Sequence, residues 1–579
     1  MITGASSPVT PPQDPLSSSE RLFAEGLWNM LGGDTAELRK ARGAFYTPKQ
    51  LCEYLAQWAI RSADDRILEP SCGEAAFLVS AARRLQALGE GRLLAAGELH
   101  GIELHEDSAA HARALMASMG ASATIRLADF LDILPEPRYD AVIGNPPYVR
   151  YQSATGDDRL RSRTVALRGG VALTNLASSW AAFVVHASLF LREGGRLGLV
   201  LPAELLTVNY AAGVRSFLMR RFGRVRLVLF EERVFPGVLE EVVLLLAEGK
   251  GPTDHCELAQ LRNLSDLQTT ARSTHRWSPI PADAKWTPAL MPNRALELFG
   301  ELTCHGDFTT LEGWGDTTLG MVTGNNSYFA LSAETVRQRR IPRSELVPLS
   351  PPGSRHLRGL SFTEKAWNEM LATGSAGWLF RPGAKPSAAS QRYIADGERD
   401  SVQHAFKCRV RSPWWRVPLV KPPDLFLTYM NADTPRLCAN RAAVHHLNSV
   451  HGLYIPEGLR QVAADLLPIA ALNSLTVLGA ELIGRAYGGG MLKLEPKEAD
   501  RLPVPSPVFL SAQGDALRSL RPQIATALRG GRIGDAIALV DRVVLVDGLG
   551  IRRSRLKHLV EARSLLALRR TARGTPPRG

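Results

Sequence analysis

Short apolar runs alternate with segments of helical periodicity between about residues 42 and 249. Helical patterns at residues 75–88 and 108–119 separate the early runs. This alternation is typical of βαβ units and predicts an α/β fold with a mainly parallel sheet of seven strands. No helical pattern separates the last two runs, so we expect those two strands to form a hairpin-like pair at the sheet edge. The predicted strands are residues 67–68, 99–104, 123–127, 141–144, 197–201, 225–230 and 241–247.

The rest of the chain has a different pattern. From about residue 252 to 507 turn residues are frequent and cations cluster in segments 337–340 and 407–416, with two tryptophans in the second segment. Helical periodicity returns at residues 522–528 and 533–546, with Gly530-Gly531 as the break between them. The polar, Pro/Ser-rich N-terminus predicts a disordered leader. The expected parts are a leader over 1–40, an α/β domain over 41–250, a mixed α+β domain over 251–508 and a helical, basic segment over 509–579.

Composition narrows the class of protein. The 579 residues carry a formal charge of +12, which favours a polyanionic partner, although an arginine-rich protein without a nucleic-acid role has the same composition. No apolar run reaches the roughly 18 residues that a membrane span requires, so we expect a cytoplasmic protein with no membrane contact. The six cysteines form no CxxC pair, which disfavours a zinc site and a disulfide framework. We therefore expect reduced thiols and no metal.

The most informative string is an apolar strand that runs directly into Asn145-Pro146-Pro147-Tyr148. Catalytic groups collect at the carboxyl ends of strands in an open parallel sheet. Two prolines remove two backbone donors and leave the Asn145 side-chain oxygen and the Pro146 carbonyl as acceptors. Two such acceptors can hold both hydrogens of a planar amine and free its lone pair to attack a methyl sulfonium, while Tyr148 offers a flat face to a base. A surface turn is the alternative for the tetrapeptide alone.

Three acids stand at successive strand ends before this motif. Glu69 precedes a tight turn in which Gly73 lets the backbone come close to a ligand, and it can meet a cationic group. Glu103 can accept hydrogen bonds from two ribose hydroxyls. Asp129 can accept one from an adenine amino group, on whose ring Phe130 can stack. Any one such acid is more often a solvated strand-end residue, but three in succession favour a nucleoside cofactor.

The order and spacing of these segments resemble the gamma-class DNA adenine-N6 methyltransferases of restriction–modification systems. The resemblance implies a Rossmann-like class I S-adenosylmethionine-dependent methyltransferase domain over 41–250 and a DNA target-recognition domain over 251–508. It also implies direct methyl transfer from S-adenosylmethionine to N6 of an adenine turned out of the duplex, without a covalent enzyme intermediate.

The resemblance adds roles for single residues. Residues 43–48 resemble the leading motif of the family, whose threonine, here Thr47, contacts the cofactor. Phe183 resembles an aromatic residue near the cofactor adenine. Phe235 resembles the aromatic residue that stacks on the target adenine, which it would sandwich together with Tyr148.

Two further residues of the cofactor turn, Cys72 and Ala75, bear on how it meets the ligand. Cys72 lies in the turn, where we expect it to pack rather than to act as a nucleophile. Ala75 replaces the second glycine that the family usually has there, so we expect its methyl group to crowd the cofactor slightly.

The distal strings 323–329 and 488–496 are similar to strings of the family's recognition domains. Cations beside aromatic side chains suit phosphate contacts with stacking alongside. The alternative is a buried aromatic cluster with solvated arginines. The residues expected to contact DNA are Arg339, Arg340, Arg409, Arg411, Trp414, Trp415 and Lys493.

These observations predict a site-specific DNA adenine-N6 methyltransferase, acting as a monomer on double-stranded DNA near the bacterial nucleoid, with a separately encoded restriction endonuclease as a candidate partner. Enzymes that methylate RNA or protein glutamine also use Asn-Pro-Pro-Tyr, but usually lack a long C-terminal recognition region. A fused nuclease is disfavoured because only about 40 residues precede the methyltransferase motifs. The intact motif disfavours a catalytically silent DNA-binding protein.

Overall fold

The computed structural model describes residues 47–89, 98–149, 155–232, 234–235, 241–267, 274–279 and 284–574. The predicted leader and residues 43–46 of the leading motif lie outside them. The chain divides into two compact units, one running up to Leu201 and including Leu244–Lys250, the other made of Pro202–Val243 and the chain from Gly251 on.

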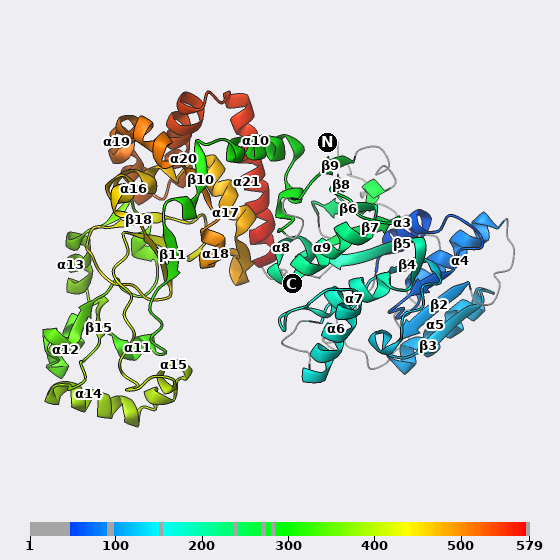
Figure 1. Ribbon diagram of the computed structural model, residues 1–579, viewed down its shortest axis with the longest axis horizontal. Coiled ribbons are helices and arrows are strands. Elements are labelled where there is room, and N and C mark those ends of the chain that lie inside the picture. The colour runs from blue at the N-terminus through cyan, green and yellow to red at the C-terminus, as the bar shows by residue number, and fades with distance from the viewer. Residues whose placement is uncertain are drawn as a thin grey trace, which may run out of the picture. The chain divides into compact units, whose positions relative to one another are not determined.

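A large sheet follows the predicted βαβ pattern (Figure 1). Its strand order is β3-β2-β1-β4-β5-β7-β6-β8-β9, and the pairs formed among β1 to β5 are parallel. The predicted Rossmann-like α/β fold with a mainly parallel sheet is thereby confirmed. The first seven strands are β1 (Ile67–Glu69), β2 (Leu99–Glu103), β3 (Ala123–Leu127), β4 (Tyr139–Gly144), β5 (Leu191–Pro202), β6 (Arg224–Phe230) and β7 (Val242–Glu248).

Burial explains why these runs form strands. Every residue of β1 and of β4 is buried, as expected for central parallel strands covered on both faces, whereas β3 at the sheet edge has only one buried residue. The register places Ile67 of β1 between Leu99 and Ala141 of its two neighbours, so the strand ends come to one edge. The helices of this unit are α3 (Lys49–Ala59), α4 (Ala76–Leu88), α5 (Glu106–Ser118), α6 (Gly156–Arg168) and α7 (Ser179–Ser188).

The last two predicted strands, β6 and β7, are neighbours in the sheet as expected, but their expected place at the sheet edge is wrong. In the sheet order β7 lies between β5 and β6, and β6 is followed by two further strands, β8 (Cys256–Leu261) and β9 (His275–Trp277). The strand β8 is parallel to β6 and almost entirely buried, so the chain returns to the sheet instead of leaving it. The sheet therefore has nine strands rather than seven among the described residues.

The second unit contains a mixed sheet of order β11-β19-β16-β18-β14. Its central strands are antiparallel, and the buried rings of Phe329, Phe362 and Phe426 belong to the core beside it. The strands are β11 (Asp316–Leu319), β14 (Ser361–Phe362), β16 (Leu425–Thr428), β18 (Leu437–Asn440) and β19 (Val450–Tyr454). Other elements include α10 (Asn293–Cys304), α12 (Ala333–Arg339), α13 (Glu364–Ala372), α14 (Ala388–Arg399), α15 (Phe406–Arg409), α16 (Glu457–Ala470), α17 (Ser474–Ile483) and α18 (Pro496–Ala499).

The predicted helical C-terminus is confirmed, with α19 (Pro507–Arg529), α20 (Ile533–Asp541) and α21 (Arg553–Gly574) shown in orange and red in Figure 1. The helix α19 is longer than expected because Ser506 caps its first turn, and Gly531, with φ +71°, separates it from α20. Among the described residues no single helix is long and apolar enough to cross a membrane; α16 and α17 pass this test only as a pair bent by 87°.

Candidate active site

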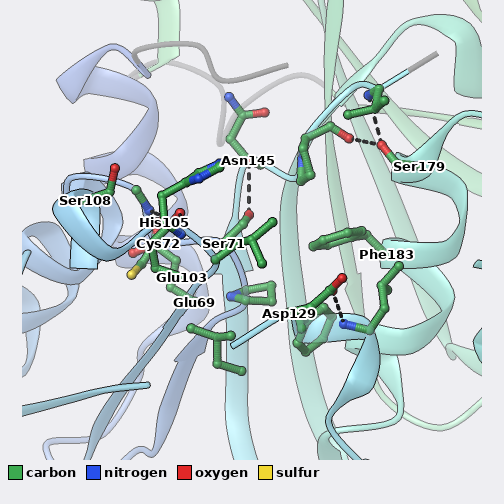
Figure 2. Close-up of a pocket in the computed structure, with 18 of the residues that line it drawn as sticks. Glu69, Ser71, Cys72, Glu103, His105, Ser108, Asp129, Asn145, Ser179 and Phe183 are labelled. Carbon is green, nitrogen blue, oxygen red and sulfur yellow. Dashed lines mark hydrogen bonds between the residues drawn. The ribbon is translucent and has the colours of Figure 1, made fainter. Parts of the chain in front are cut away.

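The carboxyl ends of the strands in the first unit surround a cavity of about 530 Å³. Figure 2 shows Glu69, Cys72 and Glu103 gathered on one side of it and Asp129 and Phe183 on the other. All eight predicted cofactor residues line this cavity, together with two residues of the Asn-Pro-Pro-Tyr motif. They are Thr47, Glu69, Cys72, Gly73, Glu103, Asp129, Phe130 and Phe183, with Asn145 and Pro147.

Glu103 at the end of β2 organises the turn that follows β1. The backbone N–H of Gly73 donates to Glu103 Oε2 at 2.8 Å, and that of His105 donates to Oε1 at 3.0 Å. Gly73 has φ +47°, a left-handed conformation that glycine adopts without a steric penalty. Because each carboxylate oxygen accepts one N–H, the carboxylate is held in one orientation while both oxygens keep a lone pair for a ligand.

Glu69 is 2% exposed, and its Oε2 accepts a hydrogen bond of 3.0 Å from the N–H of Leu78 in the first turns of α4. Burial raises the pKa of this carboxyl well above its usual range, so it keeps its proton to a higher pH than an exposed glutamate does. Burial, with Glu69 and Glu103 nearby, also raises the pKa of the Cys72 thiol. A thiolate is therefore disfavoured, which supports packing over nucleophilic attack for Cys72.

Ala75 adopts φ +68° at the start of α4. This left-handed conformation costs an alanine about 1 kcal/mol relative to its ordinary conformations. Its side chain is fully buried, and it is not among the described residues that line the cavity. The methyl group is therefore not part of the cavity wall, and crowding of the cofactor stays a prediction.

The two oxygens of Asp129 already have partners within the first unit. Oδ1 accepts a hydrogen bond of 2.9 Å from the N–H of Leu131, and Oδ2 forms an ion pair of 2.7 Å with Arg161 of α6. Arg161 also lines the cavity and contacts Asp132 at 3.1 Å. Sequence reasoning missed Arg161, because no local signal connects it with an acid 32 residues earlier. The ion pair fixes the orientation of the Asp129 carboxylate.

The Phe130 ring belongs to an aromatic cluster, with ring centroids 5.3 Å from Phe183, 4.7 Å from His186 and 5.1 Å from Phe190. His186 is fully buried, with Nε2 near the carbonyl oxygens of Phe130 and Ile133. Burial lowers its pKa to about 4, so the imidazole is neutral at neutral pH. The cluster provides an uncharged, aromatic wall to the cavity.

The Asn-Pro-Pro-Tyr motif follows β4, and both the nitrogen and the oxygen of the Asn145 side-chain amide form hydrogen bonds. Asn145 Nδ2 donates to Thr47 Oγ1 at 3.1 Å, and the Tyr148 hydroxyl lies 2.7 Å from Asn145 Oδ1 and 3.0 Å from the Val200 carbonyl oxygen. The contact between Thr47 and Asn145 was not anticipated from the sequence. Stacking of a base on Tyr148 stays a prediction.

The start of α7 fastens the other side of this loop. The Ser179 hydroxyl donates to the Pro147 carbonyl and accepts from the N–H of Val149, the latter at 2.9 Å. Within the described part of the chain no hydrogen bond reaches the carbonyl oxygen of Pro146. This oxygen therefore keeps its capacity to accept a hydrogen bond from a ligand. Phe235 belongs to the second unit, where it is buried, and its stacking role stays a prediction.

Several residues predicted to contact DNA are engaged within the second unit. Arg411 donates to the Thr323 carbonyl at 2.7 Å and to that of Val322, and Trp414 and Trp415 pack against the hydrophobic core. All three residues are half-buried and have contacts inside the unit, and contact of this stretch with DNA stays a prediction.

The other predicted DNA contacts lie nearer the surface. Arg339 pairs with Asp396 at 2.6 Å, and Lys493 with Glu495 at 2.8 Å. Arg340 and Arg409 are exposed. An aromatic residue that sequence reasoning missed, Phe406, is 65% exposed and has Lys407 and Arg409 near its ring. DNA contact by these side chains stays a prediction. No group of His, Cys, Asp and Glu suited to a metal ion occurs in the described part of the chain.

Comparisons with known proteins divide the chain in the same way. Residues 26–265 match the N-6 DNA methylase family, and residues 283–545 match the C-terminal domain of the type II methyltransferase M.Eco57I. The type II methyltransferase M.XamI from Xanthomonas campestris pv. amaranthicola is 26% identical over 80% of this chain and 85% of its own length. M.AccI from Acinetobacter calcoaceticus is 21% identical over the same shares. The structure of the type IIL restriction-modification enzyme MmeI in complex with DNA is 12% identical, with TM-score 0.47, over 95% of this chain and 77% of that one.

The cavity suits S-adenosylmethionine, the methyl donor of class I methyltransferases. The buried carboxyl of Glu69 suits its cationic end, the oriented carboxylate of Glu103 suits two hydroxyls, and the aromatic wall around Phe130 suits a purine. The chain thus combines an S-adenosylmethionine-dependent methyltransferase domain of the N-6 DNA methylase family with a domain of the M.Eco57I C-terminal type, and so belongs with the DNA methyltransferases of restriction–modification systems.

Proposed function

We propose that the enzyme methylates the exocyclic N6 of adenine at a specific DNA sequence. The observation that carries this proposal is the position of Asn145 in the cavity wall, directly after β4, with its amide held by Thr47. Pro146 follows it, and no described N–H donates to the Pro146 carbonyl. An enclosed site cannot reach N6 within a stacked duplex, so the adenine has to be turned out at a cost of a few kcal/mol.

The chemistry follows from these two acceptors. Asn145 Oδ1 has two lone pairs, so it can accept from a substrate amine even while Tyr148 donates to it. With the Pro146 carbonyl it can hold both N6 hydrogens and favour a tetrahedral nitrogen. When bound, S-adenosylmethionine supplies an electrophilic methyl group on a positively charged sulfur. The nitrogen lone pair forms the new bond and the carbon–sulfur bond breaks, and the amine then loses one proton. Positioning and fixed dipoles supply the rate enhancement.

In this proposal each cofactor-binding residue contacts a different part of S-adenosylmethionine. Glu69 meets the cationic amino-acid end, and Glu103 accepts from the ribose hydroxyls. Asp129, held by Arg161, accepts from the adenine amine, and Phe130 and Phe183 contact its ring. Cys72, Gly73 and Thr47 shape the wall between these groups.

The direct test is transfer of a labelled methyl group from S-adenosylmethionine to unmethylated bacterial genomic DNA, followed by mass spectrometry of the nucleosides. We expect the label in N6-methyladenine. Label in RNA or in protein glutamine, with none in DNA despite cofactor binding, would overturn the proposal. We also propose a monomer that acts beside a separately encoded restriction endonuclease, because a self-contained recognition domain needs no two-fold partner; sedimentation of the enzyme on DNA tests the monomer.

Binding of S-adenosylmethionine is expected to tighten as the pH rises and to release protons. Burial raises the pKa of Glu69, so at low pH the free enzyme holds the neutral carboxyl, whereas a cationic ligand favours the carboxylate. Calorimetry in two buffers of different ionisation enthalpy, kept below the α-amino pKa of about 7.7–8.0, measures the released protons. Glu69→Gln should abolish the release. An affinity independent of pH in the unmodified enzyme would contradict this role for Glu69.

Thr47→Val is expected to lower kcat roughly two- to tenfold, because a net hydrogen bond is worth about 0.5–1.5 kcal/mol. Valine keeps the shape of threonine but removes the Oγ1 that accepts from Asn145 Nδ2, so the amide loses its fixed orientation. Steady-state methylation of genomic DNA checks this expectation, with Thr47→Ser as the variant that retains the hydroxyl. Equal loss in both variants would assign the effect to packing.

A further inference from the structure

A small hairpin in the second unit has an exposed strand. It consists of β20 (Arg485–Tyr487) and β21 (Met491–Lys493), joined through Gly488–Gly490 and paired with β17 (Met430–Asn431). All three residues of β20 are exposed, and Tyr487 is 59% exposed. Gly489 and Gly490 have φ of +73° and +70°, and Gly489 is exposed at the tip of the turn.

The C-terminal helix fastens this turn. Arg570 of α21 is 5% exposed; it binds both carboxylate oxygens of Glu481 at 2.9 Å and donates to the Gly490 carbonyl. A Cβ atom on Gly490 would lie 2.9 Å from the Thr571 Cα, so only glycine lets the turn approach the helix this closely. Tyr487 is therefore exposed on an anchored hairpin.

Cations dominate beside the hairpin. Ile483, two residues before β20, lines a cavity of about 840 Å³ whose described lining includes four cations and one carboxylate. The carboxylate, Glu498, pairs with both Lys285 and Arg485, at 2.8 and 2.7 Å. Lys493 lies 5.4 Å from the Tyr487 ring. The cations of the cavity are Arg215, Lys285, Lys497 and Arg501.

We propose that this hairpin and the cationic cavity beside it bind the sugar–phosphate backbone of duplex DNA, with Tyr487 as a contact residue and Arg570 as the residue that positions the turn. The proposal rests on DNA being the substrate. Gly489 is exposed, has a positive φ and has nothing within 4 Å of its Cβ position, so an anionic ligand can approach the backbone there. Tyrosine hydroxyls and cations are common donors to phosphate oxygens, and the excess of positive charge matches a polyanion.

The test uses the full chain and a short duplex of random sequence, with fluorescence anisotropy measured at several salt concentrations. We expect Tyr487→Ala to raise the Kd for DNA about tenfold, the effect of losing one hydrogen bond to a charged phosphate. The pair Lys497→Ala/Arg501→Ala should reduce the salt slope by about two. Val508→Ala removes another exposed side chain, 82% exposed, and should bind DNA as the unmodified enzyme does. The affinity for S-adenosylmethionine should stay unchanged in all of these variants.

Arg570 is tested through Arg570→Met and Arg570→Lys, with thermal unfolding measured alongside. We expect a folded Arg570→Met variant to raise the KM for DNA without changing the KM for S-adenosylmethionine, and Arg570→Lys to restore part of the loss. If Arg570→Met does not fold, the DNA affinities of Tyr487→Ala and of Lys497→Ala/Arg501→Ala test the proposal. Genomic DNA methylated normally, with unchanged DNA affinity in Tyr487→Ala and in the double variant, would overturn the hairpin proposal alone. An unmodified enzyme that neither binds nor methylates DNA would overturn the proposed function with it.

Discussion

Asn145→Ala is expected to lower kcat for DNA methylation about 10²- to 10³-fold, the usual effect of losing one preorganised hydrogen-bonding group at a reacting centre. The alanine cannot accept an N6 hydrogen, so one of the two acceptors that bring the amine lone pair into position is lost. The affinity for S-adenosylmethionine should change little, because the proposed cofactor-binding residues Glu69, Glu103 and Asp129 also line the cavity and are unchanged. The loss should therefore appear in kcat and not in the KM for the cofactor.

Single-turnover transfer of labelled methyl to genomic DNA measures this effect. Asn175→Ala is the matched control, because Asn175 lines the same cavity but is exposed and contacts Arg163 instead of the motif. We expect near-normal transfer in the control. Comparable rates in Asn145→Ala and Asn175→Ala would show that the motif asparagine does not act on the reacting amine.

Glu103→Gln is expected to raise the Kd for S-adenosylmethionine about 100-fold, which is about 2.8 kcal/mol at 1.4 kcal/mol per tenfold. Both Glu103 oxygens accept a backbone N–H, from Gly73 and from His105. In glutamine one of these oxygens is replaced by an NH₂ group. That group is a donor, so it cannot accept the hydrogen bond from the backbone N–H that faces it. Hydrogen bonds to charged groups are worth about 1.5–3 kcal/mol each. The substitution should therefore weaken both the hydrogen bond that orders the turn and the contact with the ribose hydroxyls.

Calorimetric titration with S-adenosylmethionine measures this loss, and circular dichroism establishes that the variant is folded. Glu74→Gln makes the same chemical change beside the same cavity, at a carboxylate without a hydrogen bond to another described residue, and should bind the cofactor within about twofold of the unmodified enzyme. A Glu103→Gln affinity equal to that of Glu74→Gln would refute the role assigned to Glu103.

The sequence predicted the strand ends that form the site because their signal is local. An apolar run followed by an acid, as at Glu69 and Glu103, marks a strand and its carboxyl end without any knowledge of distant residues. Parallel strands then bring such acids to one edge, and the predicted cofactor residues line one cavity. Their roles toward the ligand are predictions that the proposed variants test.

The partners of these residues could not be predicted in the same way. Asn145 and Thr47 are 98 residues apart, and Arg161 and Asp129 are 32 apart, so neither pair leaves a pattern that a short window can detect. The extra strand β8 was missed because its residues alternate weakly and follow a turn-rich stretch. Only its parallel pairing with β6 makes it part of the sheet.

In the second unit, local composition alone does not predict which side chains are exposed. Arginines and tryptophans close together predicted a DNA-contacting stretch, but they did not reveal that Arg411 and Trp415 also have contacts inside the unit. Tyr487 lies in a sequence without a comparable cluster and is exposed. Exposure depends on which residues a fold covers, and that depends on contacts between segments far apart in the chain, such as α21 and the Gly488–Gly490 turn.

The place of β7 has a consequence for synthesis of the protein. The first unit includes Leu244–Lys250, and in the sheet β7 lies next to β5 although β6 precedes it along the chain. On the ribosome β5 therefore has an open edge until Glu248 has emerged. Unpaired strand edges invite association between chains, so a chaperone or a slow pause would act most usefully in this interval. A fragment ending before Glu248 would keep that edge open permanently and should aggregate.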